Sequence, residues 1–305
     1  MDWGEGLGRR LAEAVELLRS IDGISGLILG GKEEPDGVWP LSDVDIVIVY
    51  ADDVRAAATA ELERRCGAIA DFWGWAGVSG SFDLGALAFT ESEAAAVVEA
   101  GSAGLAARVT DPRWFFAMDA AYGGRVELGR RGVVVELSEM LTSARFAADV
   151  VAARLGSWRE MATEALTDHD TLTAAEAMID LCTEHWGTRS GAVSRRWTAF
   201  ESLAGRHGRP HVAEIILASR GARVDDAAAR LADAPWWLRR RIDAALAARL
   251  AVGEDVTPAQ TARDQLVGFA HLWRRRGLPP QPWTEPVDVD ASAVAGELTT
   301  LLRAY

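Results

Sequence analysis

The sequence predicts an α+β protein, with an N-terminal α/β domain around a small mixed sheet and an all-helical C-terminal domain. In the first part of the chain, short runs rich in Val and Ile alternate with stretches of helical spacing. After about residue 138 the strand patterns nearly vanish, and Ala, Leu, Arg and Glu recur with helical periodicity. We therefore expect one domain over residues 1–137 and a second over residues 138–305.

Composition and charge are those of a folded, acidic protein. The 305 residues are 49% hydrophobic and 25% charged, which suits one large or two ordinary globular domains. Lys and Arg number 32 against 45 Asp and Glu, so the formal net charge is -13. Proteins that grip long nucleic acid neutralise phosphates with clustered basic residues. The charge therefore disfavours long RNA or DNA as a partner and favours a small cationic one.

The cysteines and the N-terminus indicate a cytoplasmic protein. Cys66 and Cys182 lie far apart without metal-ligand or CxxC spacing, so we expect two buried thiols in a reducing compartment. The first residues carry acids and no long apolar core, unlike a signal peptide. No apolar run approaches the roughly 20 residues of a membrane span, so no membrane partner is expected.

The elements of the first domain follow from local patterns. Apolar residues at three-four spacing predict the first helix, and a dense run of Val and Ile predicts the clearest strand. In order, we expect a helix over 5–20, a strand over 24–30, a turn-rich loop over 32–41, a strand over 43–50, a helix over 52–70, a strand over 81–89 and a hairpin over 125–137 turning near Gly129–Gly132.

The second domain shows only helical spacing and one proline-rich connector, at 279–286. We expect helices over 139–156, 172–187, 192–206, 210–219, 236–251, 258–276 and 291–303.

Two acids open the clearest strand. Asp43 and Asp45 are two residues apart, so on a strand both side chains leave the same face, with Cα atoms roughly 6–7 Å apart. Such a pair can hold two divalent ions roughly 3.5–4 Å apart. Magnesium prefers this combination of a few carboxylates with water and phosphate oxygens.

Two glycines end the preceding strand. Without side chains, Gly30 and Gly31 let their backbone N–H groups approach a phosphate closely. Lys32 can add a positive charge, although it can equally point to solvent. A phosphate-binding turn is therefore expected beside the metal site.

Together, Leu29-Gly30-Gly31 and Ser42-Asp43-Val44-Asp45-Ile46 resemble the signature of the DNA polymerase β-like nucleotidyltransferase superfamily. The nearest look-alikes are small bacterial antibiotic nucleotidyltransferases and the minimal nucleotidyltransferases of toxin–antitoxin systems. The resemblance covers residues 24–136, while the helical remainder is similar only in architecture. In one departure, Gly31 stands where many members have a serine whose hydroxyl meets the nucleotide phosphates.

The resemblance implies a third carboxylate on a later strand, which acts on the acceptor hydroxyl. Asp83, in SFDLGALAF, is the main candidate, and Glu136, in GVVVELS, is the rival. Lys32 and Ser42 are further candidates for nucleotide binding. In similar enzymes a basic residue of the helical domain reaches the nucleotide phosphates. Arg196 is the candidate for that contact, with a solvated helix face as the alternative.

The expected activity is transfer of a nucleoside monophosphate, AMP from ATP or another NTP, onto a hydroxyl of a small acceptor such as an antibiotic. Asp43, Asp45 and Asp83 would hold two Mg²⁺ ions. The alternatives are a toxin–antitoxin type enzyme acting on protein or tRNA, and a catalytically degenerate nucleotide-binding module. No Walker, GxSxG or GxGxxG motif indicates another chemistry.

Overall fold

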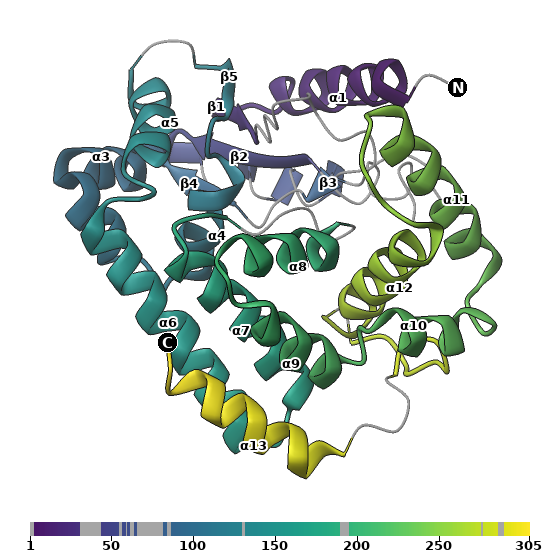
Figure 1. Ribbon diagram of the computed structural model, residues 1–305. Coiled ribbons are helices and arrows are strands. Elements are labelled where there is room, and N and C mark those ends of the chain that lie inside the picture. Colours follow the sequence, from purple (N-terminus) through teal and green to yellow (C-terminus); the bar gives the residue numbers. More distant parts are fainter. Residues whose placement is uncertain are drawn as a thin grey trace. The chain divides into compact units, whose positions relative to one another are not determined.

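The computed structural model describes most of the chain and divides it into two compact units. The described residues are 3–30, 44–54, 57–58, 60–61, 64–65, 82–83, 87–129, 132–189, 195–275, 277–285 and 290–305. The sheet unit comprises Met1–Arg154 and the helical unit Leu155–Tyr305. The division falls inside one helix, α6 (Ala148–Thr167), whereas the sequence pattern changes near residue 138 (Figure 1).

The described strands form one mixed sheet, as the sequence predicts. They are β1 (Ile24–Leu29), β2 (Val44–Tyr50), β3 (Phe82–Asp83), β4 (Ala88–Thr90) and β5 (Arg125–Leu128). β1 lies between β5 and β2 and is antiparallel to both. The free side of β2 pairs in parallel with β3 near its beginning and with β4 near its end. In place of one predicted strand over 81–89, the structure describes two short strands, β3 and β4, along one edge of β2.

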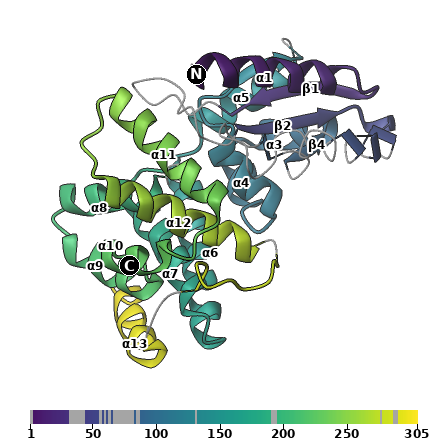
Figure 2. The ribbon, with the colours of Figure 1, turned by 90° about the vertical axis from the view of Figure 1, so that its right-hand side faces the viewer.

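Helix α1 (Trp3–Arg19) covers one face of the sheet. Its buried residues pack with alternate residues of the strands. The cluster comprises Val15, Leu18, Ile21, Ile24, Leu27, Leu29, Ile46, Ile48, Tyr50 and Ala58. On the opposite side of β1 and β2 lies α4 (Pro112–Ala120), as Figure 2 shows. There Phe89 of β4 packs on Trp114 of α4, with ring centroids 4.0 Å apart.

The predicted hairpin over 125–137 is wrong in its second half. β5 ends at Leu128, and α5 (Val133–Ser143) follows instead of a second strand. Within α5, Val134, Leu137, Ser138 and Leu141 are buried, which is helical spacing. A Cβ at Gly26 of β1 would lie 2.3 Å from Val134 Cγ2, so α5 packs directly against β1. This packing overrides the strand propensity of the three valines.

Two helices of the sheet unit were not expected, α3 (Glu91–Ala106) and α4. Both begin at side-chain caps. Thr90 and Glu93 form a capping box at α3. The Asp111 carboxylate accepts a hydrogen bond from the backbone of α4, whose first residue is a proline. Of the helix expected over 52–70, the structure describes a 3₁₀ turn at Asp52–Val54 and isolated helical residues beyond it.

The described residues of the helical unit form helices and no strand, as predicted. One predicted helix, 139–156, is in fact two, because α5 ends at Ser143 and α6 begins at Ala148. The short α10 was not predicted. The helices after α6 are α7 (Thr171–His185), α8 (Arg196–Arg206), α9 (Pro210–Arg220), α10 (Val224–Leu231), α11 (Trp236–Ala251), α12 (Pro258–Arg275) and α13 (Ala291–Leu302).

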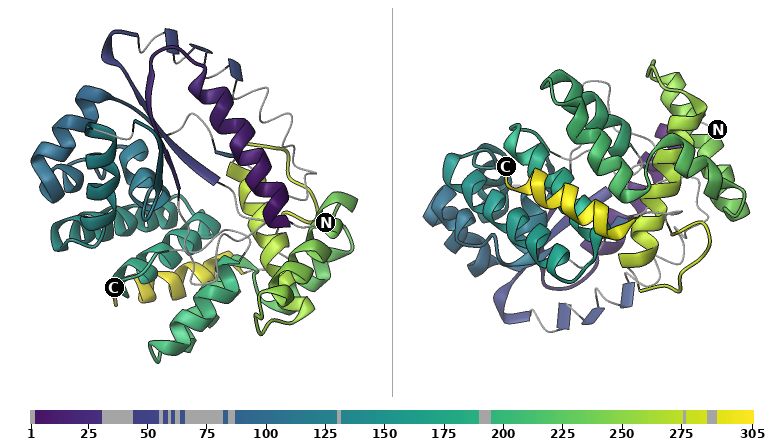
Figure 3. Two further views of the ribbon diagram at one scale, coloured as in Figure 1. Left: turned by 90° about the horizontal axis from the view of Figure 1, so that it is seen from above. Right: turned by 60° about the horizontal axis from the view of Figure 1, so that its bottom comes forward.

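Helix α13, yellow in Figure 3, packs on α7 and α9 of the same unit. Cys182 of α7 is a buried free thiol, as expected, and burial raises its pKa to about 12. No described helix has the length and apolar character needed to cross a membrane.

Candidate functional site

Asp45 lies at the beginning of β2 and faces away from α1. Ile46 and Ile48 belong to the core under α1, so alternation places Asp45 on the opposite face, with Val47 and Val49. Both valines are buried, whereas Asp45 is half-buried. β2 therefore anchors the acid through an apolar strand and leaves it partly accessible at the strand's beginning.

Asp83 is the register partner of Asp45 on the neighbouring strand. β2 and β3 run in parallel, with Val44 beside Phe82 and Asp45 beside Asp83. Adjacent strands lie about 4.7–4.9 Å apart, so the backbones of the two acids are neighbours. The structure thus brings together an acid of the 43–50 strand and one of the 81–89 strand, at the beginning of both.

Glu136 is not on a strand. It lies in the first turns of α5 and is exposed to solvent. Glu136 was the rival candidate for the third carboxylate because it was expected on a strand, and the structure places it on a helix instead.

Gly30 lies directly opposite Asp45 across the antiparallel pair. Its N–H donates to the Asp45 carbonyl oxygen at 2.8 Å. A Cβ at Gly30 would lie 2.5 Å from the Ala120 carbonyl oxygen and 3.3 Å from Asp45 Cβ. A side chain therefore does not fit here. The N–H that was expected to approach a phosphate is bonded within the sheet instead.

Gly30 is packed tightly between β2 and α4. The carbonyl oxygen of Ala120, the last residue of α4, and Asp45 Cβ close the place where a side chain would lie. The glycine therefore allows the close approach of α4 to the sheet beside Asp45.

Several predicted site residues lie outside the described residues: Gly31, Lys32, Ser42 and Asp43. The side chain of Asp83 is likewise outside them. Within the part of the chain that is described, no group of three or more His, Cys, Asp or Glu residues could hold a metal ion. The register of Gly30, Asp45 and Asp83 at one end of the sheet is thus the described part of the site.

Arg196 begins α8 in the helical unit, and its guanidinium contacts two acids. It donates to Asp180 Oδ2 at 2.8 Å and lies 3.5 Å from Glu176 Oε2. The side chain is only 11% exposed, so the alternative of a solvated helix face is wrong. Although burial alone would lower the pKa of Arg196, Asp180 and Glu176 raise it. The arginine is held as a buried cation by its own unit.

One ionic cluster of the sheet unit had no sequence signal. Asp119 of α4 accepts from Arg145 Nε at 2.7 Å and from Arg154 Nη2 at 2.5 Å. Both arginines are almost fully buried, and Arg154 also donates to the Phe115 carbonyl oxygen at 2.7 Å. The three residues are scattered in sequence, and only tertiary packing brings them together. The cluster holds α4 against the segment that follows α5.

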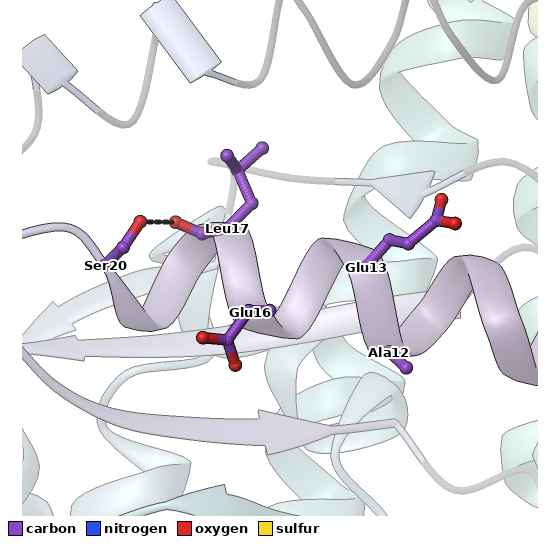
Figure 4. A pocket seen from close by; sticks show the side chains of 5 residues that line it. All are labelled: Ala12, Glu13, Glu16, Leu17 and Ser20. Carbon is purple, nitrogen blue, oxygen red and sulfur yellow. Dashed lines mark hydrogen bonds between the residues drawn. The ribbon is translucent and has the colours of Figure 1, made fainter.

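A hollow of about 640 Å³ lies elsewhere, along α1. It is lined by Ala12, Glu13, Glu16, Leu17 and Ser20 (Figure 4). Ser20 Oγ donates to the Leu17 carbonyl oxygen at 2.8 Å, which closes the last turn of the helix. Neither Asp45 nor Gly30 lines this hollow. We therefore do not assign the candidate site to it, although it is large.

The candidate site is therefore the beginning of β2 and β3 beside the end of β1. Comparisons with known proteins add no assignment: no protein-family model matches the chain, and neither does a curated protein or a solved structure.

Proposed function

We propose that the chain is a metal-dependent nucleotidyltransferase that moves a nucleoside monophosphate, AMP from ATP, onto a hydroxyl of a small acceptor. The observation that carries the proposal is the register of Asp45 and Asp83 on parallel strands, with Gly30 opposite Asp45. This register puts acids from two sequence segments at one end of the sheet. The resemblance of the GG and SDVD segments to nucleotidyltransferases implies such an arrangement.

The residues at this position suit magnesium. Asp43, Asp45 and Asp83 would hold the ions through their carboxylate oxygens. When bound, the two ions would neutralise charge on the triphosphate and on the departing pyrophosphate. Carboxylate groups supply the oxygen ligands that magnesium prefers.

The chain's own residues then divide the remaining work. Gly31, Lys32 and Ser42 would bind the phosphates. Gly30 supports them indirectly, because its N–H and its lack of a side chain hold the end of β1 against β2 and α4. Arg196 has no part in this scheme, since Asp180 and Glu176 already neutralise it.

In the reaction, the acceptor oxygen attacks the α-phosphorus while the bond from that phosphorus to the oxygen bridging to the β-phosphate breaks. Pyrophosphate leaves with that bridging oxygen. The acceptor hydroxyl loses its proton to the Asp83 carboxylate, which acts as the general base. Catalysis consists mainly of positioning and electrostatic stabilisation, with no covalent enzyme intermediate.

The acceptor we propose is small, bears a hydroxyl and is cationic. The net charge of -13 would attract such a molecule and repel a polyanion such as RNA. Submicromolar, salt-sensitive RNA binding with AMP appearing on the RNA would contradict this part of the proposal.

The direct test is incubation with ATP labelled at the α-phosphate, Mg²⁺ and a panel of aminoglycoside-like amines, RNA and protein. Label should move to a small amine-rich molecule, with release of pyrophosphate, and Asp45→Asn should abolish the transfer. Glu136→Gln is the matched control, because it also turns a carboxylate into an amide but lies exposed on α5. An Asp45→Asn protein with near-normal turnover would refute the proposal, while magnesium-ATP binding without any transfer would indicate a binding module.

A further inference from the structure

Gly30 touches both the end of α4 and Asp45. A Cβ at Gly30 would lie 2.5 Å from the carbonyl oxygen of Ala120, the last residue of α4, and 3.3 Å from Asp45 Cβ. The Gly30 N–H donates to the Asp45 carbonyl oxygen at 2.8 Å. Because protein interiors are closely packed, a shift at the end of α4 is passed through Gly30 to Asp45. Figure 2 shows α4 beside β2.

Asp119 fastens the last turn of α4, one residue before Ala120. Its Oδ1 accepts from Arg145 Nε at 2.7 Å, and its Oδ2 accepts from Arg154 Nη2 at 2.5 Å. Both arginine side chains are 1% exposed. Arg154 also donates to the carbonyl oxygen of Phe115, one turn earlier on α4, and its guanidinium lies 4.2 Å from the centroid of the Phe115 ring. Two buried cations therefore hold the last turn of this helix.

The turn after α4 is held as well, by two hydroxyl groups of α5. Thr142 Oγ1 accepts from the Gly123 N–H at 3.0 Å, and Ser138 Oγ donates to the Gly124 carbonyl oxygen at 3.4 Å. A Cβ at Gly124 would lie 2.8 Å from the Leu29 carbonyl oxygen, so the turn also packs on the end of β1. The helix is thus fastened to the sheet unit both within its last turn and directly after it.

We propose that Asp119 is a positioning residue for Asp45, acting through the end of α4 and Gly30. This inference rests on the proposed function, in which Asp45 binds the metal ions. Asp119 itself binds neither the ions nor the nucleotide, because its two oxygens accept from the buried arginines. A site for two ions roughly 3.5–4 Å apart needs its ligands placed to within about 0.5 Å. A small displacement of the end of α4 is therefore enough to weaken the metal site.

Hydrogen exchange tests the coupling without any metal. Asp119→Asn keeps the shape of the side chain, but an amide cannot accept from both arginines. The Gly30 amide, which donates to Asp45, should then exchange about tenfold faster or more than in the wild type. The amide of Ile28, in the middle of β1, should keep its rate. An unchanged rate at Gly30 would overturn the inference.

Metal binding tests the consequence for the site. Mn²⁺ alone serves as the probe, followed by the electron paramagnetic resonance signal of the free ion. Its affinity should fall about tenfold or more in Asp119→Asn, under conditions where the slow exchange at Ile28 shows that the sheet is folded. Asp119→Glu keeps a carboxylate for both arginines and should restore most of the affinity. A merely structural role would leave Mn²⁺ affinity unchanged in every folded variant.

Asp111→Asn is the matched control at the other end of α4. Asp111 accepts from the Arg113 N–H at 2.9 Å and pairs with Arg113 Nη2 at 2.8 Å. The substitution removes the same charge from the same helix, and asparagine still caps it. Both the exchange of the Gly30 amide and the Mn²⁺ affinity should stay as in the wild type. Equal effects of the two substitutions would mean that α4 acts only through its stability, which would overturn the positioning role.

The two proposals fail in different ways. If Mn²⁺ affinity does not fall in Asp45→Asn, the proposed function is wrong. If it falls there and stays unchanged in Asp119→Asn, only the positioning role is wrong.

Discussion

The described core between α1 and the sheet is a cluster of apolar side chains, whereas the helical unit buries charged side chains among its helices. In the sheet unit, Asp45 lies at the beginning of a strand, half-buried and opposite Gly30. In the helical unit, Glu176 and Asp264 are buried together with the guanidinium groups that neutralise them. Asp119 of the sheet unit is ion-paired with Arg145 and Arg154 in the same way, whereas Asp45 belongs to the beginning of a strand.

Glu176 illustrates the helical unit. Arg220 Nε donates to its carboxylate at 2.9 Å, and His271 Nδ1 lies 3.4 Å from the same oxygen. Asp264 accepts from Arg249 at 2.9 Å, from Arg263 at 2.8 Å and from Thr198 Oγ1 at 2.6 Å.

Such networks pair buried acids with cations, and removing one partner of a buried pair is expensive. A buried acid with several cationic partners organises the helices around it, whereas the half-buried Asp45 lies at the beginning of a strand, beside Asp83 of the neighbouring strand.

The largest expected effect lies in the sheet unit and concerns Asp83. If it removes the acceptor proton, Asp83→Asn should slow transfer by about two to four orders of magnitude, the range for loss of a general base. Magnesium-ATP affinity should change only a few-fold, because Asp43 and Asp45 would still bind the triphosphate complex. Single-turnover rates and calorimetry measure the two quantities. Glu136→Gln should leave both unchanged, and the reverse pattern would make Glu136 the acting acid.

In the helical unit, removing a buried acid should lower the free energy of unfolding. Glu176→Gln leaves the buried Arg220 without its carboxylate and Arg196 with Asp180 alone, and removing one partner of a buried ion pair costs about 3–5 kcal/mol. Hydrogen exchange should accelerate in α7 and α9 and stay slow in β1 and β2. The control is Glu201→Gln, whose carboxylate is 38% exposed and should cost at most about 1 kcal/mol. Equal losses of unfolding free energy in the two variants would contradict the expectation that the buried pair contributes more to stability than the exposed pair.

The same carboxylate predicts a pH dependence. Burial alone would raise the pKa of Glu176, but Arg196, His271 and Arg220 lower it from 4.5 to about 2. Because the folded pKa is depressed, the stabilisation is complete above about pH 4.5 and is lost as the pH falls toward 2. Urea unfolding at pH 6 and pH 3 should show the gap between wild type and Glu176→Gln shrinking at the lower pH. A gap of the same size at both pH values would argue against an ionised, ion-paired Glu176.

The smallest effect compares one substitution in the two units. Gly30→Ala puts a methyl group 2.5 Å from the Ala120 carbonyl oxygen, so it should destabilise the sheet unit by about 1–3 kcal/mol. Gly156→Ala lies on the exposed side of α6 with nothing within 4 Å, and should stabilise by up to about 1 kcal/mol. Thermal unfolding of both variants measures the difference. A stabilising Gly30→Ala would mean that α4 does not close against β1 as described.

Several elements followed from local sequence alone. The runs of Val and Ile predicted β1 and β2 to within a residue or so, because β-branched residues suit a buried strand and glycines bound the first run. The caps of α3 and α4 were also visible in the sequence, as Thr90-x-x-Glu93 and Asp111-Pro112, although neither helix was predicted from them. The valines at the beginning of α5 led to the wrong prediction of a strand, because strand propensity is weak where a helix can bury the same residues.

What the sequence determined about this protein is the α+β order of its elements and the acids that begin its strands. Only the tertiary structure decided that Asp83 lies beside Asp45, that Gly30 has no room for a side chain and that Arg196 is buried between two acids. The reason is physical. Periodicity, propensity and caps act over a few residues, whereas strand register, close packing and ion pairing join segments tens of residues apart.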